Sequence, residues 1–122
     1  MTKISLENYN GFKTLKEFMD NKQYTRNGIL RYEQIFGSGF ISTGGLETTQ
    51  KFFETLDLKP NQKVLDVGCG IGGGNFLMAK QFGIDCLGMD LSANVIGIAW
   101  EKAQEHQDLN VSYLFIFEDN SF

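Results

Sequence analysis

The chain has 122 residues, a net charge of −4 and 42% hydrophobic residues. This length suits one small domain, and the apolar content is sufficient for a core, which argues against general disorder. The negative balance argues against a nucleic-acid partner and a polybasic membrane patch, and the N-terminus has no apolar run resembling a secretory signal or a membrane span.

Three helices are predicted in the first sixty residues. Apolar residues at helical spacing predict a short helix over Thr14–Asp20 and a second helix over Asn27–Phe36, which a Gly-Ser-Gly sequence ends. A third helix is predicted over Leu46–Leu56, followed by a break at Pro60 and Asn61.

From Lys63 onward, strands and helices alternate. Short apolar runs predict the strands, and the elements in chain order are strand Val64–Val67, helix Asn75–Phe82 with Gly83 at its C′ position, strand Cys86–Asp90, helix Ala93 to about Gln107 with Ser92 as N-cap, and strand Val111–Phe117. This order predicts an α/β fold with a parallel sheet, right-handed crossovers and helices on its faces.

A glycine-rich sequence, DVGCGIGGG at residues 66–74, follows the first strand of this alternation. Glycines permit a sharp turn from strand to helix and let a ligand contact the backbone. Asp90 lies twenty residues after Gly70, at the end of the second strand, where a carboxylate can accept both hydroxyl hydrogens of a ribose. Gly68, Gly70 and Asp90 are therefore candidate ligand-binding residues.

Three interpretations of this sequence stay open. The spacing of Gly68, Gly70 and Gly73 matches the Gly-x-Gly-x-x-Gly pattern of dinucleotide sites. Alternatively, the glycines form only a tight turn and Asp90 caps the next helix. We favour a site for S-adenosylmethionine, because the carboxylate of Asp66 would repel a pyrophosphate but attract the cationic amino-acid end of this cofactor.

Several motifs also carry a family resemblance. DVGCGIG at residues 66–72 is similar to the first motif of class I S-adenosylmethionine-dependent methyltransferases. Upstream, NKQYT at 21–25, RYEQIFG at 31–37 and FISTGGLE at 40–47 resemble phosphoethanolamine N-methyltransferases, and these blocks are more specific than the glycine motif. The resemblance implies an incomplete Rossmann-like class I methyltransferase sheet, beginning at residue 61, behind an N-terminal helical lid over residues 1–60.

The family methylates phosphoethanolamine stepwise to phosphocholine, with S-adenosylmethionine as cofactor and small molecules as substrates. By this resemblance, Tyr24 in the lid is a catalytic residue that pairs with a histidine from later in the chain and helps to orient or deprotonate the amine. The cofactor contacts that it implies are Gln23 in the lid, Tyr32 beside the pocket, Ile41 and Ser42 at the methionine part, Gly68 at the backbone side, and Asp90 and Leu91 at the ribose and adenine. Asp66 and Gly70 complete the predicted cofactor site.

The last residues depart from the family pattern. VSYL at 111–114 runs directly into FIFEDNSF at 115–122, where the family has a strand-end acid and further residues. The acceptor-binding residues of the family would lie beyond Phe122, so we expect a truncated chain that is inactive on its own and whose open sheet edge favours self-association. The alternative function is a catalytically inactive fragment or pseudoenzyme that at most binds S-adenosylmethionine.

The two cysteines, Cys69 and Cys86, form no CxxC pair and have no neighbouring histidine. We therefore expect no metal site. Isolated thiols fit a reducing compartment, so we expect a cytoplasmic protein.

Overall fold

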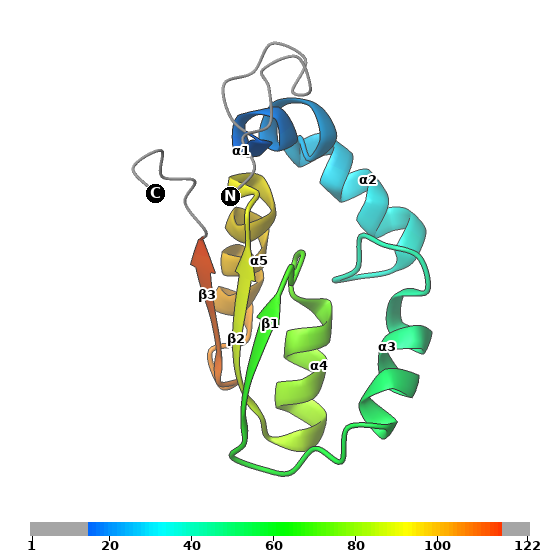
Figure 1. Ribbon diagram of the computed structural model, residues 1–122, viewed down its shortest axis with the longest axis vertical. Helices are drawn as coiled ribbons and strands as arrows, with labels where there is room; N and C mark the ends of the chain where they lie inside the picture. Colours follow the sequence, from blue (N-terminus) through cyan, green and yellow to red (C-terminus); the bar gives the residue numbers. More distant parts are fainter. Residues whose placement is uncertain (1–14, 116–122) are drawn as a thin grey trace.

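The computed structural model describes residues 15–115 (Figure 1). Its elements in chain order are α1 (Leu15–Phe18), a π-helical turn η2 (Met19–Gln23), α2 (Arg26–Phe36), α3 (Gly45–Glu54), β1 (Lys63–Val67), α4 (Gly73–Phe82), β2 (Asp85–Asp90), α5 (Ala93–Glu105) and β3 (Val111–Phe115). From α2 to α5, every predicted element is present with boundaries within two residues of the prediction. The first predicted helix is instead divided into α1 and η2 and continues to Gln23; Thr14 and residues 116–117 lie outside the described residues.

The sheet is parallel throughout, with the strand order β1-β2-β3. Val64, Cys86 and Val111 are register partners across the three strands. The carboxyl ends of all three strands therefore lie at one edge of the sheet, which is where parallel α/β sheets bind ligands. The predicted α/β class and the parallel sheet are confirmed.

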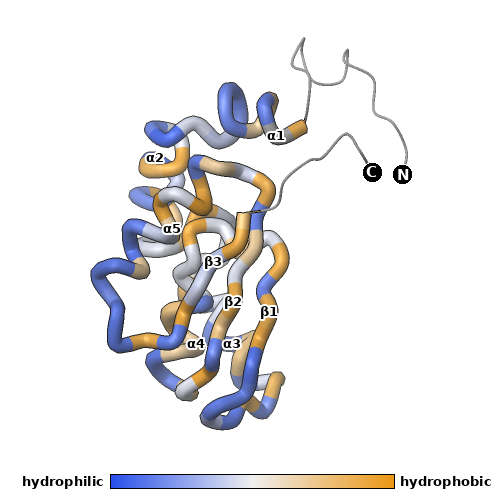
Figure 2. The backbone as a smooth tube through the Cα atoms, turned by 90° about the vertical axis from the view of Figure 1, so that its left-hand side faces the viewer, coloured by the Kyte–Doolittle hydropathy of each residue, from blue (hydrophilic) through white to orange (hydrophobic). Residues whose placement is uncertain are grey.

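Both helices that connect the strands lie on the same face of the sheet. Tyr113 of β3 contacts Phe76 of α4 and Trp100 of α5, with ring-centroid distances of 6.1 and 6.4 Å. The alternation of strands and helices predicts helices on the faces of the sheet but does not say which face each one covers. Two right-handed crossovers that move in the same direction must place their helices on one side, which Figure 2 shows for α4 and α5.

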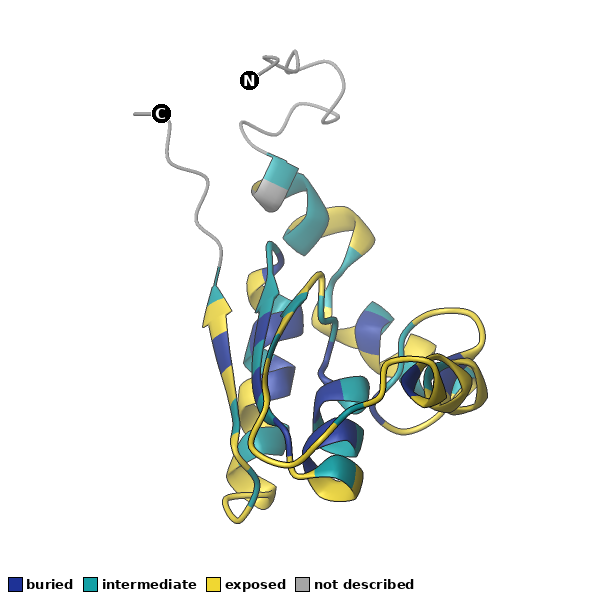
Figure 3. Ribbon diagram, turned by 60° about the horizontal axis from the view of Figure 1, so that its bottom comes forward, coloured by how far each residue is buried: buried dark blue, intermediate teal, exposed yellow. Residues whose placement is uncertain are grey.

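The core lies between this face and the helices, where Figure 3 shows the buried residues gathered. α3 packs on the outer side of α4: Phe53 is buried beside Met78, Ile84 and Cys86 and meets the ring of Phe82 edge-on at 6.2 Å. A second cluster joins Ile29 of α2 to the glycine loop and to α5. The helical N-terminal half is thus tied to the sheet by apolar packing at two places.

The opposite face of the sheet carries apolar side chains that no element of residues 15–115 covers. Val67, Met89 and Leu114 are register partners across it, and Val67 and Leu114 are 69% and 51% exposed. Leu65 lies beside Leu87 on the same face and is 57% exposed. Across the described residues, no helix has the length and apolar character needed to span a membrane.

Candidate cofactor site

The glycine loop between β1 and α4 forms one wall of a cavity. Gly68 and Gly70 have φ angles of +78° and +60°, in the left-handed region that favours glycine. The backbone N–H groups of Gly68 and Cys69 donate to the carbonyl of Met89 at 2.7 and 3.0 Å. The loop is therefore fastened to the carboxyl end of β2, beside Asp90.

Asp90 joins the glycine loop to the start of α5. Its Oδ2 accepts from the Gly70 N–H at 3.0 Å, and its Oδ1 accepts from the Ser92 N–H at 3.2 Å. Ser92 is the predicted N-cap of α5, and its hydroxyl oxygen accepts from the Val95 N–H at 3.2 Å. The carboxylate is thus held at the strand end by two backbone donors, and each oxygen keeps acceptor capacity for a ligand.

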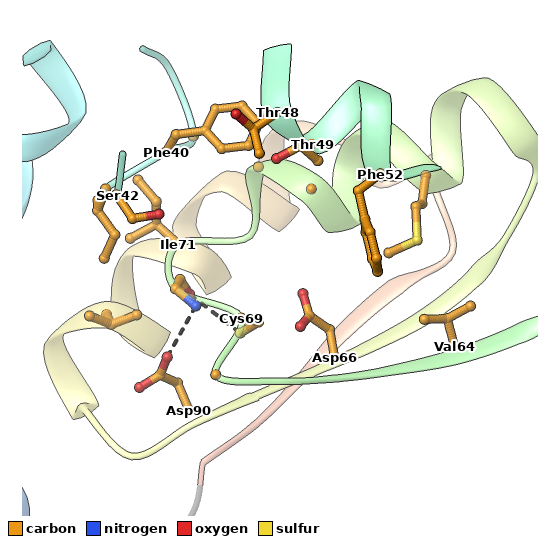
Figure 4. A pocket seen from close by; sticks show the side chains of 18 of the residues that line it. Phe40, Ser42, Thr48, Thr49, Phe52, Val64, Asp66, Cys69, Ile71 and Asp90 are labelled. Atoms are coloured by element: carbon orange, nitrogen blue, oxygen red, sulfur yellow. Dashed lines mark hydrogen bonds between the residues drawn. The ribbon is translucent and has the colours of Figure 1, made fainter. Parts of the chain in front are cut away.

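Asp66 is the second carboxylate of the cavity. Its Oδ2 accepts from the side-chain amide of Asn75 at 2.8 Å, and Asn75 is fully buried in the first turns of α4. Figure 4 shows Asp66 and Asp90 projecting from neighbouring strands into the same cavity, with Phe40 and Ser42 opposite them.

The cavity has a volume of about 810 Å³. Of the predicted site residues, it is lined by Tyr24, Ile41, Ser42, Asp66, Gly68, Gly70 and Asp90. Gln23, Tyr32 and Leu91 are outside this lining; Gln23 is exposed and Tyr32 is 37% exposed. Phe52, Leu56 and Val64 extend the lining on the side of α3.

Glu33 of α2 fixes the loop that carries Ile41 and Ser42, a role that no motif or spacing in the sequence indicates. Its Oε2 accepts from the Gly39 N–H and from the Lys102 ammonium group of α5, both at 2.7 Å. The Gly39 carbonyl in turn accepts from the Gly73 N–H at 2.9 Å. A side chain at Gly73 would collide with this carbonyl, so the two backbones approach closely because Gly73 has no Cβ.

The charges around the cavity are negative. Burial raises the pKa of the Cys69 thiol to about 12, and the Asp90 and Asp66 carboxylates add to this effect. The lining includes both carboxylates and, within the described part of the chain, no lysine, arginine or histidine. Such a cavity attracts a cationic ligand. Residues 15–115 contain no cluster of three or more His, Cys, Asp or Glu that could hold a metal ion.

The N-terminal arm, which we define as residues 15–24, closes one side of the cavity. Met19 and Tyr24 of the arm belong to the cavity lining. Tyr24 also packs against the apolar cluster that contains Ile29, Ile71 and Val95. Its carbonyl accepts from the side-chain amide of Asn94 in α5 at 2.8 Å.

Comparison with known proteins places this geometry among methyltransferases. The sequence model of the mycolic acid cyclopropane synthetase family matches residues 42–116. Phosphoethanolamine N-methyltransferase 3 from Arabidopsis thaliana is 60% identical over 101 residues, which make up 83% of this chain and 20% of the relative. The chain thus spans about a fifth of the length of that relative.

Two solved structures of phosphoethanolamine N-methyltransferase 2 from Haemonchus contortus resemble the fold. The complex with S-adenosyl-L-methionine has a TM-score of 0.80 and 39% identity, over 92% of this chain and 28% of the solved chain. The complex with phosphomonomethylethanolamine and S-adenosylhomocysteine has a TM-score of 0.81 and 38% identity, over 90% and 27% of the two chains. The likeness to phosphoethanolamine N-methyltransferases that the sequence motifs indicated is confirmed.

Proposed function

We propose that this chain, which belongs to the mycolic acid cyclopropane synthetase family, is the S-adenosylmethionine-binding part of a phosphoethanolamine N-methyltransferase. The observation that carries the proposal is the pairing of two carboxylates, Asp66 and Asp90, in one cavity formed by the glycine loop. The relative from Arabidopsis thaliana and the solved relative from Haemonchus contortus both carry this activity in their names. One structure of the latter is a complex with the cofactor itself.

The charges of the cavity suit this cofactor. S-adenosylmethionine carries a sulfonium and an ammonium group, and Asp66 supplies the negative charge that the ammonium end needs. Asp90 accepts from the ribose hydroxyls, because its carboxylate stands at the end of β2 with free acceptor capacity. A dinucleotide pyrophosphate would meet two carboxylates in the same space, which disfavours that alternative.

The remaining roles extend from these two residues. Ile41 and Ser42 contact the methionine part, and Gly68 and Gly70 let the cofactor lie against the backbone. Leu91 follows Asp90 directly and packs near the adenine. Gln23, Tyr32 and Leu91 stand outside the present cavity lining, so their contacts with the cofactor require a change of side-chain position. We assign residues 1–60 to a lid and residues 61–122 to the start of the cofactor-binding domain.

We propose that the reaction is methyl transfer to the nitrogen of phosphoethanolamine or its methylated forms, towards phosphocholine. The sulfonium supplies the reactivity, and the protein positions the amine in line with the methyl carbon. Tyr24 helps to orient or deprotonate that amine, since only a free amine can attack. The acceptor phosphate needs cationic donors, which the described cavity lining does not contain, so residues outside this lining bind it.

A radiolabelled methyl-transfer assay tests this proposal against the alternative of a cofactor-binding chain without activity. The protein is incubated with labelled S-adenosylmethionine and with phosphoethanolamine, phosphomonomethylethanolamine or ethanolamine. Label in the phosphorylated amines alone supports the assigned acceptor and would overturn the expectation that this chain is inactive on its own. Cofactor binding without transfer supports the alternative, and transfer to ethanolamine as readily as to phosphoethanolamine would contradict the assigned acceptor.

We further propose a cytoplasmic location, because Cys69 and Cys86 both carry free thiols and Cys86 is buried. Self-association through the open sheet is a second proposal, supported by the exposed side chains of Leu65, Val67 and Leu114. Light scattering of the purified chain over a concentration series tests it. A constant monomer mass would contradict self-association.

A further inference from the structure

The carboxylate of Asp20, in the N-terminal arm, lies at the N-terminus of α5, more than seventy residues away in sequence. Its Oδ1 accepts from the Ser92 hydroxyl at 2.7 Å and from the Asn94 N–H at 3.2 Å. Its Oδ2 accepts from the Ala93 N–H at 3.2 Å. Ser92 caps α5 locally, and Asp20 adds a charged cap from a distant segment, where the helix dipole favours a negative group.

Asn94 completes the contact in the opposite direction. Its side-chain amide donates to the carbonyl of Asp20 at 3.0 Å and to the carbonyl of Tyr24 at 2.8 Å. The two bonds hold both ends of η2 and thereby fix the path of the chain from Asp20 to Tyr24. We call the contact between Asp20 and residues 92–94, with the return bonds of Asn94, the clasp.

The clasp shares a turn with the candidate ribose acid. Ser92 donates its N–H to Asp90 and its hydroxyl to Asp20, so one residue connects the two carboxylates. Met19 and Tyr24, which flank the clasped segment, line the same cavity as Asp90. Figure 1 shows α1 lying over the N-terminal end of α5, into which this turn leads.

We propose that Asp20 and Asn94 are positioning residues, which fix the N-terminal arm over the cofactor cavity and couple its closure to ribose binding at Asp90. This inference rests on the proposed function for the identity of the ligand. A ligand held by Asp90 stabilises the turn at residues 90–94. This turn then stabilises the arm through the clasp. Conversely, an arm that has lost the clasp leaves the cavity open beside Met19 and Tyr24, so the cofactor dissociates faster.

Hydrogen exchange of residues 15–24, measured with and without S-adenosylhomocysteine, tests the proposal. In the unaltered protein, saturating S-adenosylhomocysteine should slow exchange in the arm about tenfold. Asn94→Ala should exchange faster in the arm without ligand, lose most of the ligand-induced protection at saturation, and bind S-adenosylhomocysteine about tenfold more weakly. Lys22→Ala is the matched control, because Lys22 is exposed in the same turn, and it should behave as the unaltered protein.

Each outcome decides a separate point. If hydrogen exchange in the arm is unchanged in Asn94→Ala, the clasp is overturned. If bound S-adenosylhomocysteine does not slow exchange in the arm of the unaltered protein, the coupling is overturned. A protein that binds no S-adenosylhomocysteine contradicts the proposed function, whereas the ligand-free comparison still tests the clasp. Should Asn94→Ala unfold, Asp20→Asn replaces it: this variant keeps one carbonyl oxygen but loses the charge, so it should show the same changes to a smaller extent.

Discussion

The Gly70 N–H donates to the Asp90 carboxylate at 3.0 Å, across twenty residues of sequence. This bond joins the glycine loop to the end of β2. The loop and the carboxylate thereby form one wall of the cavity. A second backbone donor, Ser92, holds the other oxygen. The Asp90 carboxylate therefore has a structural role even without a ligand. A test of its role in binding must measure that structural role separately.

Replacement of Asp90 should weaken cofactor binding more than it weakens the fold. Asp90→Ala removes the proposed hydrogen bonds to the ribose, and one charge-assisted hydrogen bond is worth roughly 1.5–3 kcal/mol. It also leaves the Gly70 and Ser92 N–H groups without this acceptor. Calorimetry should show at least a tenfold loss of affinity, with thermal unfolding measured in parallel. Asp85→Ala, at the other end of β2, is the control and should bind normally. Equal affinity in Asp90→Ala would refute the ribose assignment.

Substitution of Gly70 tests the backbone wall of the cavity. Gly70→Val forces a branched residue to a φ of +60°, which costs roughly 1–3 kcal/mol, and it places a side chain next to Ile41 on the cavity side. We expect loss of cofactor binding with helix content retained by circular dichroism. Gly97→Ala in α5 is the matched control, since a Cβ there meets nothing within 4 Å, and it should stabilise the helix by about 0.5–1 kcal/mol. Normal binding by Gly70→Val would mean that the ligand does not touch the loop.

The ion pair between Glu33 and Lys102 should make stability depend on pH. Burial alone would raise the pKa of Glu33, but the bonds from Lys102 and the Gly39 N–H, with the Lys102 charge, hold it below the ordinary value of 4.5. A carboxyl whose pKa is lower in the folded state stabilises the fold above the unfolded value, and this contribution disappears as the pH falls through the folded value.

Urea unfolding of Glu33→Gln measures this contribution. At pH 7 the variant should be less stable by about 1–2 kcal/mol, because a partly buried charged hydrogen bond is lost. The difference from the unaltered protein should shrink as the pH drops below 4.5. Glu47→Gln removes an exposed pair with Lys51 and should change little at either pH. A difference that stays constant with pH would exclude the ion pair as its cause.

The Cys69 thiol should be unreactive in the native protein although it lines the cavity. A pKa raised to about 12 leaves a thiolate fraction at pH 8 roughly a thousandfold below that of an ordinary thiol with a pKa of 9.0. Iodoacetamide labelling followed by mass spectrometry should modify Cys69 only after unfolding in guanidinium chloride. Rapid native labelling would show that the site is less buried or less negative than the structure indicates.

The sequence was sufficient for the local features of this fold. The apolar run before the glycines, the N-cap at Ser92 and the left-handed Gly83 at the end of α4 each depend on a few neighbouring residues, and the structure has all three. The placement of Asp66 and Asp90 in one cavity also followed, because parallel strands end at one edge of a sheet.

Contacts between distant segments could not be predicted in the same way. Asp20 meets α5 over more than seventy residues, and Glu33 meets Lys102 and Gly39 through the tertiary packing of α2. No periodicity or spacing marks either carboxylate as different from a solvated helix residue. The change from α1 to the π-helical turn of η2 was likewise missed, since Asn94 holds the carbonyl groups at both ends of that turn from outside it.

Calorimetric titration of the purified protein with S-adenosylmethionine shows whether this cavity binds the cofactor. We expect saturable binding at one site per chain, weakened at least tenfold in Asp90→Ala. Binding should also be weaker in Asp66→Ala, which removes the carboxylate that we propose faces the ammonium group. NADH serves as the competing ligand and should give no binding heat. Absence of S-adenosylmethionine binding by a folded protein, or tighter binding of NADH, would contradict the assignment of this cavity.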